Sequence, residues 1–99
     1  MNRDLKTVRV AAAYPVVHIS DPKKNLDEIA RLFYKLASSE IDVVVFPELC
    51  MTGYTCADLF NNTKLLDDAI ECTRILASDV KNQVVVVGLP FAVNNTLYN

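Results

Sequence analysis

Two short apolar runs dominated by β-branched residues most constrain how this chain can fold. Residues 41–46 and 83–89 are too short for helices, are almost free of polar residues, and stop at Pro47 and Pro90. Such runs predict strands of a buried parallel sheet, and residues 41–46 are expected to be buried on both faces. A third apolar run, from Thr7 to Tyr14, is stopped by Pro15 and predicts the first strand.

Helical periodicity separates these three strands. Asp21 supplies an N-cap oxygen, and Pro22 occupies the first helical position, where its missing N–H is not needed. Two apolar stripes follow the i, i+3, i+4, i+7 series. The stripes are Leu26, Ile29, Ala30, Phe33, Leu36 and Ala37, and then Leu66, Ala69, Ile70, Thr73, Leu76, Ala77 and Val80, which Leu65, Cys72 and Ile75 widen. Residues 96–98 resemble the start of a fourth strand that the chain end interrupts.

The alternation of strands and helices predicts an α/β fold with parallel pairing and right-handed crossovers, which occur in about 98% of such units. If the strands add in one direction, both helices cover the same face of the sheet. The other face would then leave apolar surface in water, at about 25 cal/mol for each Å². Either the strand order reverses, as in a doubly wound sheet, or residues outside these 99 supply a second layer.

Composition and charge argue against several classes of partner. The chain is 52% apolar, and its ten basic and twelve acidic residues are scattered and give a formal charge of -2. This pattern favours neither a nucleic-acid partner nor an anionic membrane. Charged residues interrupt Met1–Val10, so we expect no signal peptide, and no apolar run approaches the roughly 20 residues of a membrane span. We therefore expect a cytoplasmic protein.

A single carboxylate is the strongest candidate for chemistry. Glu48 follows directly after the predicted strand 41–46, and open parallel sheets bind ligands at the carboxyl ends of their strands. The neighbouring Pro47, Leu49 and Met51 could desolvate this carboxylate in part and suit it for proton transfer. In the alternative interpretation, Glu48 only caps a turn or the following helix, and local physics leaves both open.

The residues around Glu48 carry a resemblance to a known family. Phe46-Pro47-Glu48-Leu49, followed by Thr52-Gly53-Tyr54, strongly resembles the glutamate motif of the nitrilase, or carbon–nitrogen hydrolase, superfamily. Residues 55–60 narrow the resemblance to the glutaminase domain of bacterial glutamine-dependent NAD synthetases. Further similar segments are Asp21-Pro22 with Asn25 before the first helix, residues 86–90 and residues 97–99. The resemblance covers nearly the whole chain.

The resemblance implies a fold, a reaction and a set of partners. The fold would be a four-layer α-β-β-α sandwich, with residues 1–99 as a partial domain truncated before its fourth strand is complete. The family hydrolyses the side-chain amide of glutamine with a Glu, Lys and Cys triad, and its glutamate is a general base. Only Glu48 matches a triad position, so the 99-residue chain alone is expected to be inactive.

Other partners are implied for a second, synthetase domain. That domain would accept the ammonia and bind ATP, Mg and deamido-NAD, and the parent protein is expected to be a homo-oligomer. With Gly53 and Gly88 as its only glycines, this segment has no Gly-rich phosphate loop, and we expect no cofactor to bind to it.

The remaining reactive residues receive lesser roles. Cys50, Cys56 and Cys72 fit neither a disulfide framework nor a zinc site, and we interpret them as free, packed thiols and not as the nucleophile. Tyr54 stands near the glutamate in the family motif and is a candidate for lining the substrate pocket. His18 has no metal-ligand neighbour at useful spacing, so no metal site is expected.

Two other functions remain open from the sequence. The first is a stand-alone amidase of the same superfamily that acts on a small amide. The second is a non-enzymatic flavodoxin-like binding module, in which the strand order reverses and the two helices lie on opposite faces of the sheet. The strand order distinguishes this module from the sandwich.

Overall fold

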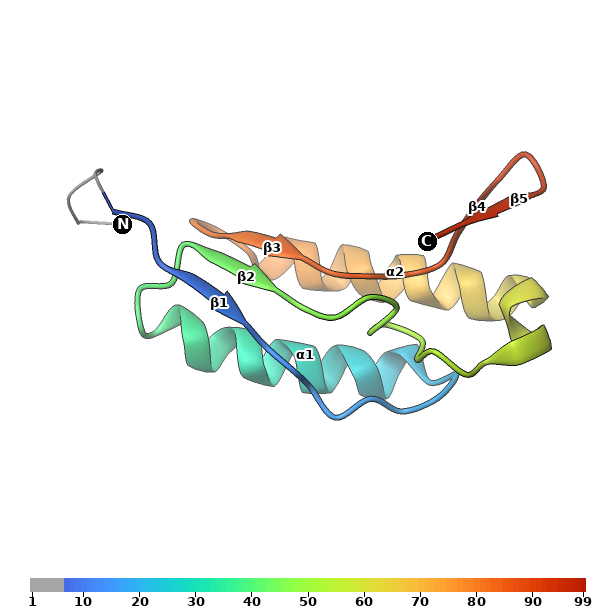
Figure 1. Cartoon of the computed structure of the whole chain (residues 1–99), viewed down its shortest axis with the longest axis horizontal. Helices are drawn as coiled ribbons and strands as arrows, with labels where there is room; N and C mark the ends of the chain where they lie inside the picture. Colours follow the sequence, from blue (N-terminus) through green and yellow to red (C-terminus); the bar gives the residue numbers. More distant parts are fainter. Residues whose placement is uncertain (1–6) are drawn as a thin grey trace.

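A computed structural model describes residues 7–99, in which two helices pack on one face of a small parallel sheet (Figure 1). The sheet contains β1 (Val10–Ala12), β2 (Val43–Val45) and β3 (Val84–Val86). The helices are α1 (Pro22–Ala37) and α2 (Thr63–Asp79), which a 3-10 helix, η1 (Ala57–Asn61), precedes. A hairpin of β4 (Phe91–Val93) and β5 (Thr96–Tyr98) follows the sheet. Arg3, Asp4 and Lys6, on which the argument against a signal peptide partly rests, lie outside the described residues.

The strands lie side by side in the order β1-β2-β3, and both pairings are parallel. Val44 of the central strand is in register with Ala11 and Val85. The chain therefore adds each strand in the same direction, and α1 and α2 pack against each other on one face. The flavodoxin-like interpretation, which requires helices on opposite faces, is wrong for this sheet.

Both long helices begin at side-chain caps. Asp21 accepts a hydrogen bond from the backbone N–H of Lys24 at 3.2 Å, and Pro22 is the first residue of α1, as predicted. Asn62 caps α2, because its side-chain oxygen accepts from the N–H groups of Lys64 and Leu65 at 2.9 and 3.3 Å. This second cap sets the start of α2 at Thr63, three residues before the predicted apolar stripe.

The two faces of the sheet differ in burial. Val44 and Phe46 face the helices and pack in one core with Ile29 and Phe33 of α1 and with Ala69, Cys72 and Leu76 of α2. On the opposite face, the side chains of Val45, Val84 and Val86 are 39%, 59% and 48% exposed. Within residues 7–99 nothing covers this second face, as expected when both helices lie on one side, and its burial by residues outside these 99 stays a prediction. We refer to this surface, together with Val10, as the open face.

The C-terminal hairpin departs from the predicted fourth strand. Residues 96–98 form β5, which pairs antiparallel with β4, so β4 was missed. Asn94 and Asn95 join the two strands with φ values of 49° and 65°. Positive φ at both central residues is typical of the type I′ turn, whose twist matches that of the strands.

Within residues 7–99, neither helix is long and apolar enough to cross a membrane.

Candidate functional site at the carboxyl edge of the sheet

The carboxyl ends of the three parallel strands lie side by side and point toward the end of the molecule where both helices begin (Figure 1). The strand pairing continues slightly beyond the strands themselves. The Ala13 N–H donates to the Val45 carbonyl and the Phe46 N–H donates to the Val86 carbonyl, each at 2.9 Å. Glu48 therefore follows a fixed backbone at the centre of this edge, as the sequence predicted. Its side chain is exposed, so the described residues do not supply the expected desolvation.

Glu48 lies in a compact turn formed by residues 47–53. The Cys50 N–H donates to the Pro47 carbonyl at 3.2 Å, and the Gly53 N–H donates to the Leu49 carbonyl at 2.7 Å. Leu49 has a φ of 51°, which is uncommon for a residue with a side chain. Cys50 and Met51 are fully buried, while Glu48 is exposed. The turn is thus anchored in the core and presents its carboxylate to solvent.

Gly88, just beyond β3, approaches this turn more closely than any side chain would permit. A Cβ atom at residue 88 would lie 2.4 Å from the Leu49 nitrogen and 2.8 Å from the Glu48 Cα. The Gly88 carbonyl accepts a hydrogen bond from the Met51 N–H at 3.1 Å. Close backbone approach is a common reason for glycine next to a strand. The end of β3 therefore fixes the turn that carries Glu48.

Asn25 ties the same turn to the loop before α1. Its side-chain oxygen accepts from the His18 N–H at 2.6 Å, and its amide nitrogen donates to the carbonyls of His18 and Met51 at 2.8 and 2.9 Å. The Ser20 N–H donates to the Thr52 carbonyl at 2.8 Å. Asn25 is buried and lies inside α1. The family resemblance had placed Asn25 before the first helix.

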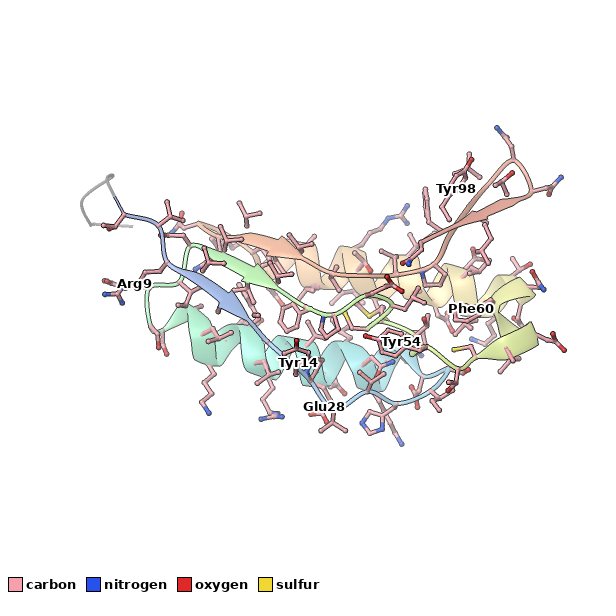
Figure 2. All side chains as sticks on the ribbon, in the orientation of Figure 1. Arg9, Tyr14, Glu28, Tyr54, Phe60 and Tyr98 are labelled. Carbon is pink, nitrogen blue, oxygen red and sulfur yellow. The ribbon has the colours of Figure 1, made fainter. Side chains whose placement is uncertain are left out.

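Tyr54 lies on the segment between β2 and η1, as Figure 2 shows, and its side chain is 52% exposed. A separate, largely apolar hollow adjoins the turn. It is lined by Leu49, Phe60, Pro90, Leu97, Tyr98 and Asn99.

The three thiols are free and buried. Burial raises the pKa of the Cys50 thiol, and burial also raises the pKa of Cys72. A nucleophilic cysteine needs the opposite shift, because the thiolate is the reactive form. These two residues therefore behave as packed thiols. The Cys56 sulfur lies 3.2 Å from the Thr52 carbonyl oxygen, within the same turn region.

His18 has a structural environment. Its backbone bonds to Asn25, and its Nε2 lies 3.6 Å from a carboxylate oxygen of Glu28. Among residues 7–99, no group of three or more His, Cys, Asp or Glu side chains could hold a metal ion.

Sequence reasoning missed Gly88 and Asn25 as parts of this site. A signal for Gly88 was available, because it is one of only two glycines and lies near the end of the predicted strand 83–89. A signal for Asn25 was its position four residues before Ile29, which places an amide on the apolar stripe of the helix. The hydrogen-bond partners of Asn25 depend on tertiary structure and could not be read from spacing.

The fold and the site define a small α/β unit whose parallel sheet carries a carboxylate at its carboxyl edge. No protein-family model matches the chain. The chain is 35% identical, over 95 residues, to the glutamine-dependent NAD(+) synthetase of Mycobacterium leprae. That alignment covers 93% of this chain and 14% of the relative. The chain is thus homologous to a segment of glutamine-dependent NAD(+) synthetases.

Two solved structures support the same relationship. The crystal structure of a glutamine-dependent NAD(+) synthetase from Cytophaga hutchinsonii matches with a TM-score of 0.89 and 29% identity, over 94% of this chain and 16% of that one. The enzyme from Acinetobacter baumannii, solved in complex with ADP, matches with a TM-score of 0.80 and 26% identity, over 91% and 17%. The chain therefore spans roughly one sixth of the length of these relatives.

Proposed function

We propose that this chain forms part of a glutamine-hydrolysing domain of a glutamine-dependent NAD synthetase and that Glu48 is the general base of that domain. The observation that carries the proposal is the position of Glu48. It lies at the carboxyl end of the central parallel strand, on a turn that Gly88 and Asn25 hold to neighbouring segments. Relatives that are glutamine-dependent by name match the chain over nearly its whole length.

The proposed chemistry assigns one proton transfer to this chain. Glu48 would take the proton of a cysteine thiol, and the resulting thiolate would attack the side-chain amide of glutamine. A thioester would form as ammonia leaves, and water would then release glutamate. A lysine would stabilise the negative charge that develops on the carbonyl oxygen. In this proposal the cysteine and the lysine come from other parts of the protein.

The proposal also says what covers the open face and which domain receives the ammonia. Residues outside this chain would add a second sheet and a second helical layer, which gives the four-layer α-β-β-α sandwich of nitrilase-like enzymes. Ammonia would pass to a synthetase domain that binds ATP, Mg and deamido-NAD. The complete protein would be a cytoplasmic homo-oligomer, with neither nucleic-acid nor membrane partners.

The test uses the complete protein with Glu48→Gln, which keeps the size of the side chain but removes its proton acceptor. Turnover with glutamine is expected to fall by about 10² to 10⁴-fold, the usual contribution of a general base. NAD formation with ammonia in place of glutamine is expected to stay near normal, because free ammonia bypasses this site. Equal loss of both activities would indicate a structural Glu48, and retention of both would mean that another group takes the proton.

A stand-alone amidase of the same superfamily remains the second candidate. It would use Glu48 in the same chemical role but would need no ammonia-accepting domain. The experiment above separates the two, because a stand-alone amidase forms no NAD with either nitrogen donor. No feature of the described residues favours this candidate over the synthetase.

A further inference from the structure

Gly88 lies against the backbone of Glu48 although the two residues follow different strands. Besides the two contacts given above, a Cβ on Gly88 would lie 2.9 Å from the Glu48 carbonyl carbon. Gly53 has a φ of +93°, where a side chain is strained in any surroundings, but Gly88 lacks such a left-handed φ. A left-handed φ is thus not what calls for glycine at residue 88, whereas the space taken by Glu48 and Leu49 leaves no room for a Cβ atom.

The carbonyl group of Gly88 holds the turn from its other side. It accepts from the Met51 N–H at 3.1 Å and lies 3.8 Å from the Cys50 sulfur. Contacts therefore reach the turn both at Glu48 and after Leu49, the residue with the left-handed φ of 51°. A turn held on both sides of its least common backbone conformation has little freedom to shift.

We propose that Gly88 is a positioning residue for Glu48, and this inference rests on the proposed role of Glu48 as the general base. The lack of a side chain on Gly88 lets β3 approach the turn closely, and the Gly88 carbonyl holds the turn at Met51 through a hydrogen bond. A methyl group at residue 88 would have to separate the two backbones by about 1 Å to reach ordinary contact distance. A displacement of that size in a catalytic group can cost about 10²-fold in rate.

The first test compares Gly88→Ala with a purely structural control in the complete protein. The control is Leu76→Ala, because Leu76 is buried in α2 and borders a hollow with Val80 and Gln83, away from the carboxyl edge. Gly88→Ala is expected to lower kcat with glutamine by about 10²-fold and to leave KM and ammonia-driven NAD formation nearly unchanged. Leu76→Ala is expected to lower the melting temperature at least as much and to keep kcat.

The second test asks whether Gly88 acts through Glu48. In a Glu48→Gln background, adding Gly88→Ala is expected to lower kcat by no more than about twofold, since the group that it misplaces is already disabled. Losses that multiply in the double variant would overturn the proposal, and so would a Gly88→Ala enzyme with normal kcat. If Glu48→Gln alone leaves glutamine turnover intact, the proposed function fails first, and that result is distinct from failure at Gly88.

A milder variant keeps the proposal testable if Gly88→Ala does not fold. Cys50→Ala adds no atoms and removes the sulfur next to the Gly88 carbonyl. It is expected to lower kcat a few-fold in the otherwise normal enzyme and to have no effect in the Glu48→Gln background. The same loss in both backgrounds would contradict a role through Glu48. Complete loss of turnover in a folded variant would also contradict it, because the effect would then exceed that of a small displacement of Glu48.

Discussion

At the scale of single residues, the site depends on Gly88 and Asn25, which are unreactive residues in closely constrained surroundings. Gly88 is constrained by the backbone of Glu48, which leaves no room for a Cβ atom. Asn25 is constrained by polarity, because its amide satisfies three backbone groups inside the protein. Buried polar groups that lose their partners are costly, so the amide of Asn25 is expected to contribute to stability.

Replacing Asn25 by leucine is expected to lower the free energy of unfolding by about 3 kcal/mol or more. Leucine keeps the number and branching of the heavy atoms, but it is bulkier, and one N–H and two carbonyls lose their partner. An unsatisfied group costs about 1–3 kcal/mol when it is fully buried, as the Met51 carbonyl bond is, and less where it is part-buried. Urea unfolding measures the loss. Asn61→Leu is the matched control, because Asn61 is exposed, and it is expected to change stability by less than about 0.5 kcal/mol. Equal effects of the two substitutions would show that the Asn25 hydrogen bonds contribute nothing.

At the scale of the elements, the start of α2 is fixed by a residue that also ends η1. The Asn62 N–H donates to the Leu59 carbonyl at 2.9 Å, while its side chain caps the first turn of α2. Asn62 thus joins two helices of different type. Cys72 and Leu76 reach the core along the helix that begins at this cap.

Removing the Asn62 cap is expected to destabilise the protein by about 1 kcal/mol, the usual cost of replacing an N-cap by alanine. Asn62→Asp should preserve most of the stability, since aspartate accepts the same hydrogen bonds and its charge suits a helix N-terminus. Thermal unfolding of both variants measures the difference. An aspartate variant as unstable as the alanine variant would show that the side-chain oxygen is not what stabilises α2.

Several elements could be predicted from the sequence because their causes are local. The cap and proline at Asp21-Pro22 place α1 correctly, and the order of strands and helices gives the parallel sheet. Glu48 also follows the carboxyl end of its strand, as predicted. By contrast, β4 is three residues long and directly follows Pro90, and an Asn-Asn pair is a weaker hairpin signal than Asn-Gly. The contact of Gly88 with the turn depends on how closely β3 approaches the turn after β2, and the spacing of residues in the sequence does not give that distance.

At the scale of the whole molecule, the open face is the main departure from a self-sufficient fold. A helical layer covers one side of the sheet, and valine side chains remain exposed on the other. Apolar surface left in water costs about 25 cal/mol for each Å², and contiguous patches of this kind promote association. The four-layer sandwich proposed for the complete protein would remove this cost.

The 99-residue chain studied alone is therefore expected to self-associate, as measured by sedimentation velocity. The double variant Val84→Thr and Val86→Thr keeps β-branched residues but makes the open face more polar, so it should associate less. Val85→Thr is the matched control, because Val85 packs against the core on the same strand. It should destabilise the fold without reducing association. A monodisperse monomer of the unmodified chain, with cooperative unfolding, would contradict the expectation.

The strand order β1-β2-β3 also has a consequence for biosynthesis. Each strand pairs with the one synthesised just before it, so the sheet can grow in the order in which the chain leaves the ribosome. Only one helix separates each strand from the strand it pairs with, so neither pairing has to wait for a strand further along the chain. The turn around Glu48 is the exception, since its contacts with Gly88 can form only after α2 and β3 have been translated. The carboxylate is thus among the first parts of the sheet edge to be made and among the last to be fixed in place.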